Sequence, residues 1–369
     1  MAMPDALQRP PGGPRLGRRR LLGLGAALPA AFFTGRVPAA LTEGLWMSEW
    51  LMYRSLFVSD GRVVDTGNGG ISHSEGQGYG MLLAEAFDDR PTFEAIWTWT
   101  QEALGGVRGD GLLAWKWEPE EGRITDPNAA SDGDLLVAWA LLRGASRWGE
   151  PGWRSEAVDL LTALERSVVV PHRLGPMLLP GPVGFDGGAE PVVNPSYWVF
   201  PALSAALAET GRRVWGDLID SGLSLCREAR FGAFDLTADW VLLSDPLQPA
   251  PGFEPVFGFN AVRVPLYLAW GRTIPAVAAE VDDQLAPYRD FWAGFDGRPA
   301  IPAVVNVETG TFSDYALSSG GRAVAVATRF AGRSEHALAM MPRVSPADDY
   351  YAATLLLLAK LALLEASEI

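Results

Sequence analysis

Residues 72–87 read SHSEGQGYGMLLAEAF, and they join a glycine-rich turn to an apolar run of helical character. The glycines at 76, 78 and 80 let the backbone approach a neighbouring segment or a ligand closely. Glu75 stands at the mouth of the predicted helix, and Ser74 is a candidate N-cap. Two interpretations stay open for these residues alone: a capped helix with a solvated glutamate, or a glutamate that acts as a general acid.

Apolar helical stretches followed by Gly/Pro-rich connections recur from about residue 41 to the end of the chain. Nearly all-apolar helices alternate with amphipathic ones, which predicts an inner ring of helices covered by an outer ring. No long low-complexity linker follows residue 40, so we expect one all-α domain over residues 41–369. Short extended segments are expected near 231–243 and 304–311. The expected helices span residues 41–57, 76–87, 91–104, 132–148, 153–168, 195–209, 212–228, 260–270, 274–291, 313–330, 334–341 and 348–366.

Composition limits the class of partner. The formal net charge of −14 argues against nucleic acid and anionic membrane surfaces, and it suits a neutral or cationic substrate. The 14 tryptophans exceed what a core of this size needs, and indole rings stack on the flat faces of sugars. A single cysteine, Cys226, excludes an intramolecular disulfide and a cysteine-cluster metal site. His73, His172 and His336 lack the spacing of a zinc site, so we expect neither a metal nor a cofactor.

The N-terminal residues 1–40 have the parts of an export signal. Arginines at positions 15, 18, 19 and 20 precede a short apolar run at 21–28, and small residues continue to Ala40. The consecutive arginines resemble a twin-arginine signal. The apolar run is too short to span a bilayer comfortably. We therefore expect a periplasmic or extracellular protein without a membrane anchor after removal of the signal.

Polar and aromatic residues gather at the expected helix entrances, where a double ring of helices presents its loops. Asp132 and Asp134 open the apolar helix at 132–148, and capping accounts for one aspartate more easily than for two. Carboxylates with aromatic neighbours at one rim predict a carbohydrate site, since two carboxylates suffice to hydrolyse a glycosidic bond without a metal. The candidate substrate-binding residues are Gln77, Tyr79, Trp115, Trp117, Asp134, Tyr197, Arg263, Tyr350 and Tyr351.

Three motifs resemble glycoside hydrolase family 8. They are SEGQGYGM at 74–81, ASDGD at 130–134 and NPSY at 194–197, in the family's order and approximate spacing. In addition, AWKW at 114–117 and PGPVGF at 180–185 resemble endoglucanases encoded with bacterial cellulose synthases. The resemblance extends from about residue 42 to the final helix. It implies an (α/α)6 barrel with an open cleft at one end and inverting hydrolysis of β-1,4-glucan.

The resemblance also implies roles for individual residues. Glu75 matches the family's general acid, and Asp132 matches the aspartate that binds the distorted sugar ring next to the scissile bond. Arg263 and Tyr197 match residues of the cleft. One tyrosine of the pair Tyr350 and Tyr351 matches a residue near the attacking water.

Asn260 departs from the family pattern at the third catalytic position. Many members have an aspartate there as the general base, although the flanking residues 261–264 match the motif. An amide orients water but does not take its proton at neutral pH. Either another carboxylate is the base, or the protein is a weak or inactive hydrolase that binds glucan. The candidate bases are Asp132, Asp134, Asp245 and Glu254.

We therefore expect a secreted endo-β-1,4-glucanase that acts on cellulose-like glucan. A role in bacterial cellulose synthesis, with association with a cellulose synthase complex, is part of this expectation. The alternatives are a chitosanase or another β-1,4-glycanase of the same family, and a weakly active or non-catalytic glucan-binding protein.

Overall fold

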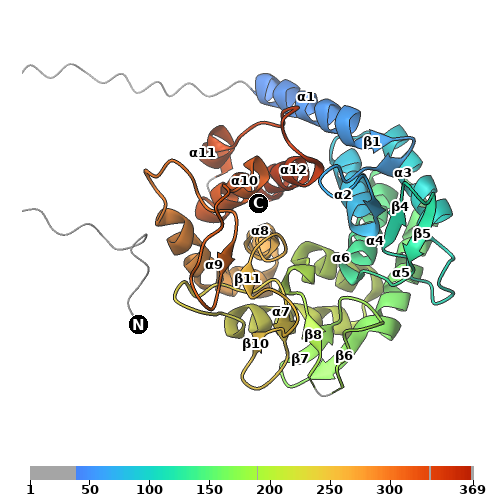
Figure 1. Ribbon diagram of the computed structural model, residues 1–369. Coiled ribbons are helices and arrows are strands. Elements are labelled where there is room, and N and C mark those ends of the chain that lie inside the picture. The colour runs from blue at the N-terminus through green and yellow to red at the C-terminus, as the bar shows by residue number, and fades with distance from the viewer. Residues whose placement is uncertain (1–38, 189, 332–333, 367–369) are drawn as a thin grey trace, which may run out of the picture.

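Two concentric rings of helices organise the chain (Figure 1). The computed structural model describes residues 39–188, 190–331 and 334–366. Each even-numbered helix contacts the next one in the inner ring, and α12 returns to α2, so the ring closes. The odd-numbered helices pack around this ring, and α1 lies beside α12. This architecture confirms the (α/α)6 barrel. The helices are α1 (Ala39–Phe57), α2 (Ser74–Ala86), α3 (Arg90–Leu104), α4 (Ser131–Trp148), α5 (Pro151–Val168), α6 (Phe200–Thr210), α7 (Arg213–Glu228), α8 (Arg263–Trp270), α9 (Pro275–Ala293), α10 (Ser319–Arg329), α11 (Ser334–Met340) and α12 (Tyr350–Glu365).

Burial separates the two rings as the sequence pattern predicts. Helices α4, α8 and α12 are buried on almost every side, whereas α3 and α5 bury one stripe each. Lys360 is a charged residue inside the buried helix α12, and its Nζ lies 2.6 Å from the Glu49 carboxylate of α1. Removing either partner would leave an unpaired buried charge, so this ion pair holds the last inner helix to the first outer one.

Glycines bring α2 and α4 into close contact near the start of both helices. A Cβ atom added at Gly133 would lie 2.1 Å from Ser74 Oγ and 2.7 Å from the backbone nitrogen of Glu75. A Cβ atom added at Gly78 would lie 2.7 Å from Leu136 Cβ. The two helices that carry Glu75 and Asp132 are therefore packed without room for a methyl group between them.

Short antiparallel strands form many of the connections between helices. The sheet β3–β4–β5 pairs His73 with Lys116 and Ser72 with Trp117, so it fixes the entrance to α2. Only β9 and β12 lie in the extended segments expected from sequence, because strands of two to four residues show no alternation to detect. The strands are β1 (Val58–Ser59), β2 (Arg62–Val63), β3 (Ser72–His73), β4 (Lys116–Glu118), β5 (Arg123–Asp126), β6 (Val169–His172), β7 (Gly175–Leu178), β8 (Val192–Val193), β9 (Val241–Leu242), β10 (Gln248–Pro249), β11 (Val256–Phe257) and β12 (Val305–Asn306).

Three predicted helices begin at least three residues later in the structure than in the sequence analysis. The segment 195–209 divides into a 3-10 turn at Pro195–Tyr197 and helix α6. Helix α8 begins at Arg263 rather than at residue 260, and α10 begins at Ser319 rather than at residue 313. The Ser318 side chain accepts a hydrogen bond from Gly321 N and so caps α10. In each case the residues before the helix form the loop at its entrance.

The predicted export signal at residues 1–40 lies outside the described residues, apart from its last two positions in α1. Of the helices that the structure describes, none has the length and apolar character needed to cross a membrane.

Gly133→Ala should destabilise the barrel because its new Cβ would overlap Ser74 and force α2 and α4 apart. Overpacking of this kind costs typically about 1–3 kcal/mol. Urea and thermal unfolding measure the loss. Gly152→Ala in α5 is the matched control, since an added Cβ there meets no atom within 4 Å. Equal stability of the two variants would contradict the close packing of α2 and α4.

Candidate active site

Arg263, the first residue of α8, connects four side chains at the end of the barrel where the inner helices begin. Its Nη1 donates hydrogen bonds to Glu75 Oε1 and, over 3.2 Å, to Asp132 Oδ2. The same nitrogen lies 3.1 Å from the Tyr79 hydroxyl, and Nη2 donates to Asn260 Oδ1 over 2.9 Å. The side chain is only 3% exposed. A single buried guanidinium thus joins the entrances of α2, α4 and α8.

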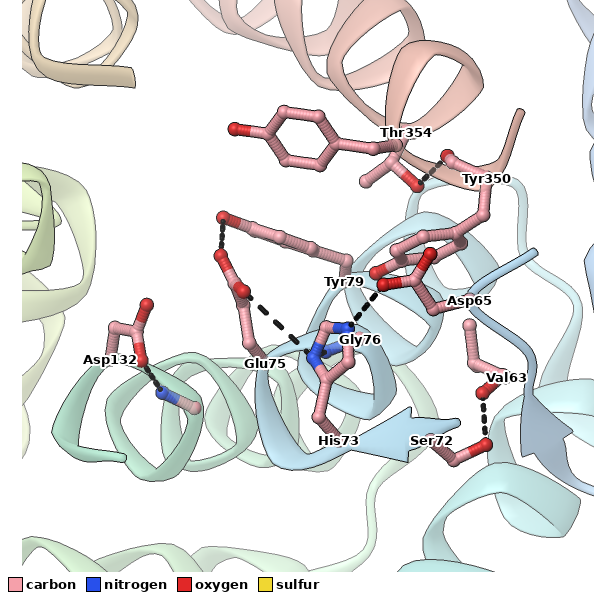
Figure 2. Close-up of polar contacts among 12 residues, drawn as sticks. Val63, Asp65, Ser72, His73, Glu75, Gly76, Tyr79, Asp132, Tyr350 and Thr354 are labelled. Carbon is pink, nitrogen blue, oxygen red and sulfur yellow. Dashed lines mark hydrogen bonds and ion pairs between the residues drawn. The ribbon is translucent and has the colours of Figure 1, made fainter. Parts of the chain in front are cut away.

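Glu75 lies in the first turn of α2, between a tyrosine and a histidine (Figure 2). The Tyr79 hydroxyl donates to Glu75 Oε1 over 3.0 Å, and it also forms a 2.6 Å hydrogen bond with the Tyr267 hydroxyl. His73 Nδ1 lies 3.8 Å from the other oxygen, Glu75 Oε2. The Glu75 side chain keeps 19% of its surface exposed, so the carboxyl group can meet a substrate.

His73 is the N-cap of α2, which corrects the prediction that Ser74 has this role. Its Nδ1 accepts a 3.0 Å hydrogen bond from Gly76 N, and its Nε2 faces Asp65 Oδ2 at 3.4 Å. The neutral ring therefore carries its proton on Nε2. Ser74 instead lies inside the helix, with its Oγ buried and without a hydrogen-bond partner among the described residues.

Asp132 is buried in the first turn of α4 and is 1% exposed. Its Oδ1 accepts a 2.8 Å hydrogen bond from Gly133 N, and its Oδ2 receives Arg263. Burial raises the pKa of Asp132 to about 7, and hydrogen bonds from the backbone act in the opposite direction with a smaller effect. The carboxyl group of Asp132 thus lies beside that of Glu75 but is more deeply buried from solvent.

Two comparisons with known proteins agree on the family. The sequence model described as "Glycosyl hydrolases family 8" matches residues 31–364. The chain belongs to glycosyl hydrolase family 8. A "Probable endoglucanase" of Novacetimonas hansenii is 35% identical over 321 residues, 85% of this chain and 90% of the relative. An endoglucanase of Cellulomonas uda is 35% identical over 303 residues, 81% of each protein.

Solved structures of the same family have the same fold as this hydrolase. The endo-beta-1,4-glucanase CMCax from Acetobacter xylinum has a TM-score of 0.79 at 34% identity, covering 88% of this chain and 99% of that one. The family 8 endoglucanase Cel10 from Klebsiella pneumoniae has a TM-score of 0.78 at 34% identity, covering 86% and 99%. These findings confirm the predicted family, the fold and the class of enzyme, a glycoside hydrolase.

Three of the residues predicted to bind substrate are buried in the hydrolase and contact other protein groups. Gln77 is fully buried: its Oε1 accepts Val63 N, and its Nε2 donates to Thr100 Oγ1. Asp134 is also fully buried, and its Oδ1 accepts Leu113 N over 2.9 Å. Gln77 and Asp134 therefore hold α2 and α4 to their neighbours. Tyr79 is 1% exposed and contacts Glu75 and Arg263 instead of solvent.

The structure separates the adjacent tyrosines at the start of α12. Tyr350 is 1% exposed, and its ring meets the His73 ring edge-on at 5.8 Å between centroids. It supports the entrance of α2 and does not reach the surface. Tyr351 is partly exposed, and its hydroxyl donates to the backbone oxygen of Phe259, next to Asn260. Of the two, Tyr351 is the one placed at the site.

The other predicted aromatic residues are partly exposed. The Tyr197 ring lies 5.9 Å from the Arg263 guanidinium, so it belongs to the same cluster. Trp117 in β4 lies under the Arg62 guanidinium, at 5.0 Å. Trp115 precedes this strand and has the Lys116 ammonium 5.1 Å from its ring.

Sequence analysis missed a stack of three aromatic rings beside Tyr197. Trp240 lies between Phe185 and Phe253, with ring centroids 5.7 and 4.5 Å away and nearly parallel planes. The Tyr197 and Trp240 centroids are 6.5 Å apart, and Phe253 is 39% exposed. The three rings come from separate loops, so no local spacing in the sequence reveals the stack.

Asp239 was also missed, and it lies behind the loop that carries Asn260. Its Oδ1 accepts hydrogen bonds from Gly258 N at 3.0 Å and from Ala261 N at 2.7 Å. Burial raises the pKa of Asp239, while hydrogen bonds from the backbone and side chain of Asn260 act in the opposite direction. The side chain is 7% exposed. The only sequence signal is an aspartate in a loop, which is too common to select it.

The two remaining candidate bases from the sequence, Asp245 and Glu254, are exposed. The Asp245 side chain is 84% exposed and 3.9 Å from Arg173. Glu254 is exposed on the loop that follows β10. Within the described part of the hydrolase, no group of three or more histidine, cysteine or acidic side chains is arranged to hold a metal ion.

Asp134→Asn should stabilise the hydrolase increasingly as the pH rises from 4 to 8. Burial raises the pKa of Asp134 to about 8, against about 3.9 in an unfolded chain. Between these pH values the folded state keeps a proton that the unfolded state releases. The contribution of Asp134 to the free energy of unfolding is therefore fully present below pH 4 and is lost as the pH rises towards 8. Asparagine keeps the acceptor for Leu113 N without the charge.

Urea unfolding at several pH values measures this effect. Asp245→Asn is the control, because it replaces an exposed carboxyl group. A stability difference between the wild type and Asp134→Asn that does not change with pH would contradict the buried acid.

Proposed function

We propose that the chain is an endo-β-1,4-glucanase that hydrolyses internal bonds of cellulose-like glucan. The observation that carries this proposal is the position of Glu75, a partly exposed carboxyl group whose Oε1 is held by Arg263 and Tyr79. The names of the relatives support the substrate: two endoglucanases at 35% identity and a solved endo-beta-1,4-glucanase at 34% identity.

In the proposed mechanism Glu75 protonates the leaving glycosidic oxygen as general acid. Because Oε1 is occupied by Arg263 and Tyr79, the transferable proton belongs on Oε2. Asp132 binds the sugar ring next to the scissile bond, and Arg263 fixes the two carboxyl groups relative to each other. Water attacks from the opposite face of the sugar, so the configuration of the anomeric carbon is inverted.

The aromatic side chains of the site suit a neutral polysaccharide. Tyr197 and the stack around Trp240 offer ring faces beside Arg263, and sugar rings present apolar faces to such surfaces. The net charge of −14 also suits a cationic polymer, so chitosan is the second candidate substrate.

Export and a partnership with cellulose synthesis belong to the same proposal. The arginines and apolar run within residues 1–40 support export to the periplasm or the exterior. The segments 114–117 and 180–185 support a link to a cellulose synthase complex through their resemblance to synthase-associated endoglucanases. Cell fractionation with and without residues 1–40 tests the location.

Glu75→Gln should reduce the release of reducing sugar from carboxymethylcellulose by about 10²–10⁴-fold, the usual contribution of a general acid. Chitosan and xylan are measured in parallel, and Glu102→Gln, at an exposed position of α3, is the control. Unchanged turnover would refute the role of Glu75. Faster wild-type cleavage of chitosan would reassign the substrate, and glucan binding without cleavage would favour a non-catalytic protein.

The first product of the wild-type enzyme should be the α-anomer, because inversion at a β-glycosidic bond gives an α-hydroxyl group. Proton NMR during the first minutes of cello-oligosaccharide hydrolysis distinguishes the anomers before mutarotation. Initial release of the β-anomer would refute inversion and would point to a double displacement.

A further inference from the structure

The orientation of the Asn260 amide is fixed by its two neighbours. Arg263 has only donors, so the atom that faces its Nη2 at 2.9 Å is the carbonyl oxygen Oδ1. The amide nitrogen Nδ2 then lies on the other side of the amide group, where the Asp239 carboxylate accepts hydrogen bonds from Gly258 N and Ala261 N, on both sides of Asn260 in the chain. Asn260 thus connects the Arg263 cluster on one side with a buried carboxylate on the other.

Asp239 is 7% exposed, whereas Asn260 is partly exposed. A water molecule at the site therefore reaches the amide and not the carboxylate. One carboxylate oxygen, Oδ1, is occupied by Gly258 N and Ala261 N. Burial raises the pKa of this carboxylate despite its hydrogen bonds, so it accepts a proton more readily than a solvated aspartate does.

Neither Asp132 nor Asp134 suits the activation of water opposite Glu75. Asp132 and Glu75 bind the same Arg263 nitrogen, so their carboxyl groups lie closer than the roughly 6.5–9.5 Å that an inverting pair needs. Both oxygens of Asp132 are also occupied. Asp134 is fully buried and bound to Leu113 N.

We propose that Asp239 is the final acceptor of the proton from the attacking water and that Asn260 relays this proton. The proposal rests on the proposed function, in which Glu75 is the acid of an inverting hydrolase. In this proposal Asn260 transfers the proton to Asp239, because an amide is not basic enough to keep it. It also explains why a carboxylate is buried directly behind that amide.

Every bond that forms in the proposed reaction is matched by one that breaks. The water oxygen forms a bond to the anomeric carbon, and the glycosidic bond breaks with its electron pair going to the leaving oxygen, which takes the proton of Glu75. The proton lost by the water goes to Asn260 Oδ1, which has a second lone pair beside the one facing Arg263. The Nδ2 proton passes to Asp239, which leaves Asn260 as its imidic acid tautomer. Return of the proton through the same path restores the amide, and solvent reprotonates Glu75.

A double-variant cycle tests the relay through kcat on carboxymethylcellulose. Asp239→Asn keeps the acceptor for the two backbone nitrogens but removes the basic group, so kcat should fall by about 10²-fold or more. In the Asn260→Asp background a carboxylate meets the water directly, and there Asp239→Asn should change kcat little. A merely structural role of Asp239 in holding the loop predicts the same loss in both backgrounds, and that result would overturn the proposal.

Sodium azide provides a second measurement, because the azide anion needs no base to attack. Azide should restore turnover of Asp239→Asn and give the α-glycosyl azide, with no such effect on the wild type. Failure of azide to restore turnover of a folded Asp239→Asn protein would refute the relay, as would full activity of that variant. If Asn260→Asp is inactive by itself, the azide measurement decides.

The same assays separate this proposal from the proposed function. Wild-type cleavage with inversion that is lost in Glu75→Gln supports the inverting endoglucanase whatever Asp239→Asn does. Absence of wild-type cleavage would refute both.

Discussion

The site depends on one buried cation. The Arg263 guanidinium is 3% exposed, and a buried charge of this kind is stable only with partners that offset its lost hydration. Its partners come from separate parts of the chain: Glu75 from α2, Asp132 from α4 and Asn260 from the loop before α8. The electrostatic requirement of a single side chain therefore brings together the residues that the proposed reaction uses.

Helices α2 and α4 are held together at both of their ends. Near the starts of the two helices, Gly133 of α4 packs against Ser74 of α2 without space for a Cβ atom. Near their C-terminal ends, Glu85 of α2 forms ion pairs with Arg143 and Arg147 of α4. Each arginine Nε lies 2.5 Å from a Glu85 carboxylate oxygen. A cavity of about 640 Å³ lies beside these ion pairs, and its remaining charged side chain, Glu209, is paired with Arg154. The opposite end of the barrel thus serves to position the helices rather than to present free charges.

The architecture could be predicted from the sequence because the distribution of apolar residues around a helix reflects its burial. Apolar residues surround α4 and α12 on all sides, whereas in α5 they form one stripe. The sequence was a less reliable guide to the role of each residue within a motif. Gln77 stands two residues after Glu75, yet it faces Val63 and Thr100 in the interior. Asp239 was not found because its relation to Asn260 is made by two loops folding against each other. Which side of a helix entrance faces solvent depends on such tertiary contacts, and no spacing rule encodes them.

The contact between Gly133 and Ser74 has a consequence for changing this enzyme by design or by natural variation. Since α2 and α4 pack there without space for a methyl group, a change in their spacing would move Glu75 relative to Asp132. New substrate preferences must then arise in parts that can vary independently, such as the loops that carry Phe185, Trp240 and Phe253. In the proposed function, the helix starts then carry the catalytic groups, and the loops determine which polymer binds.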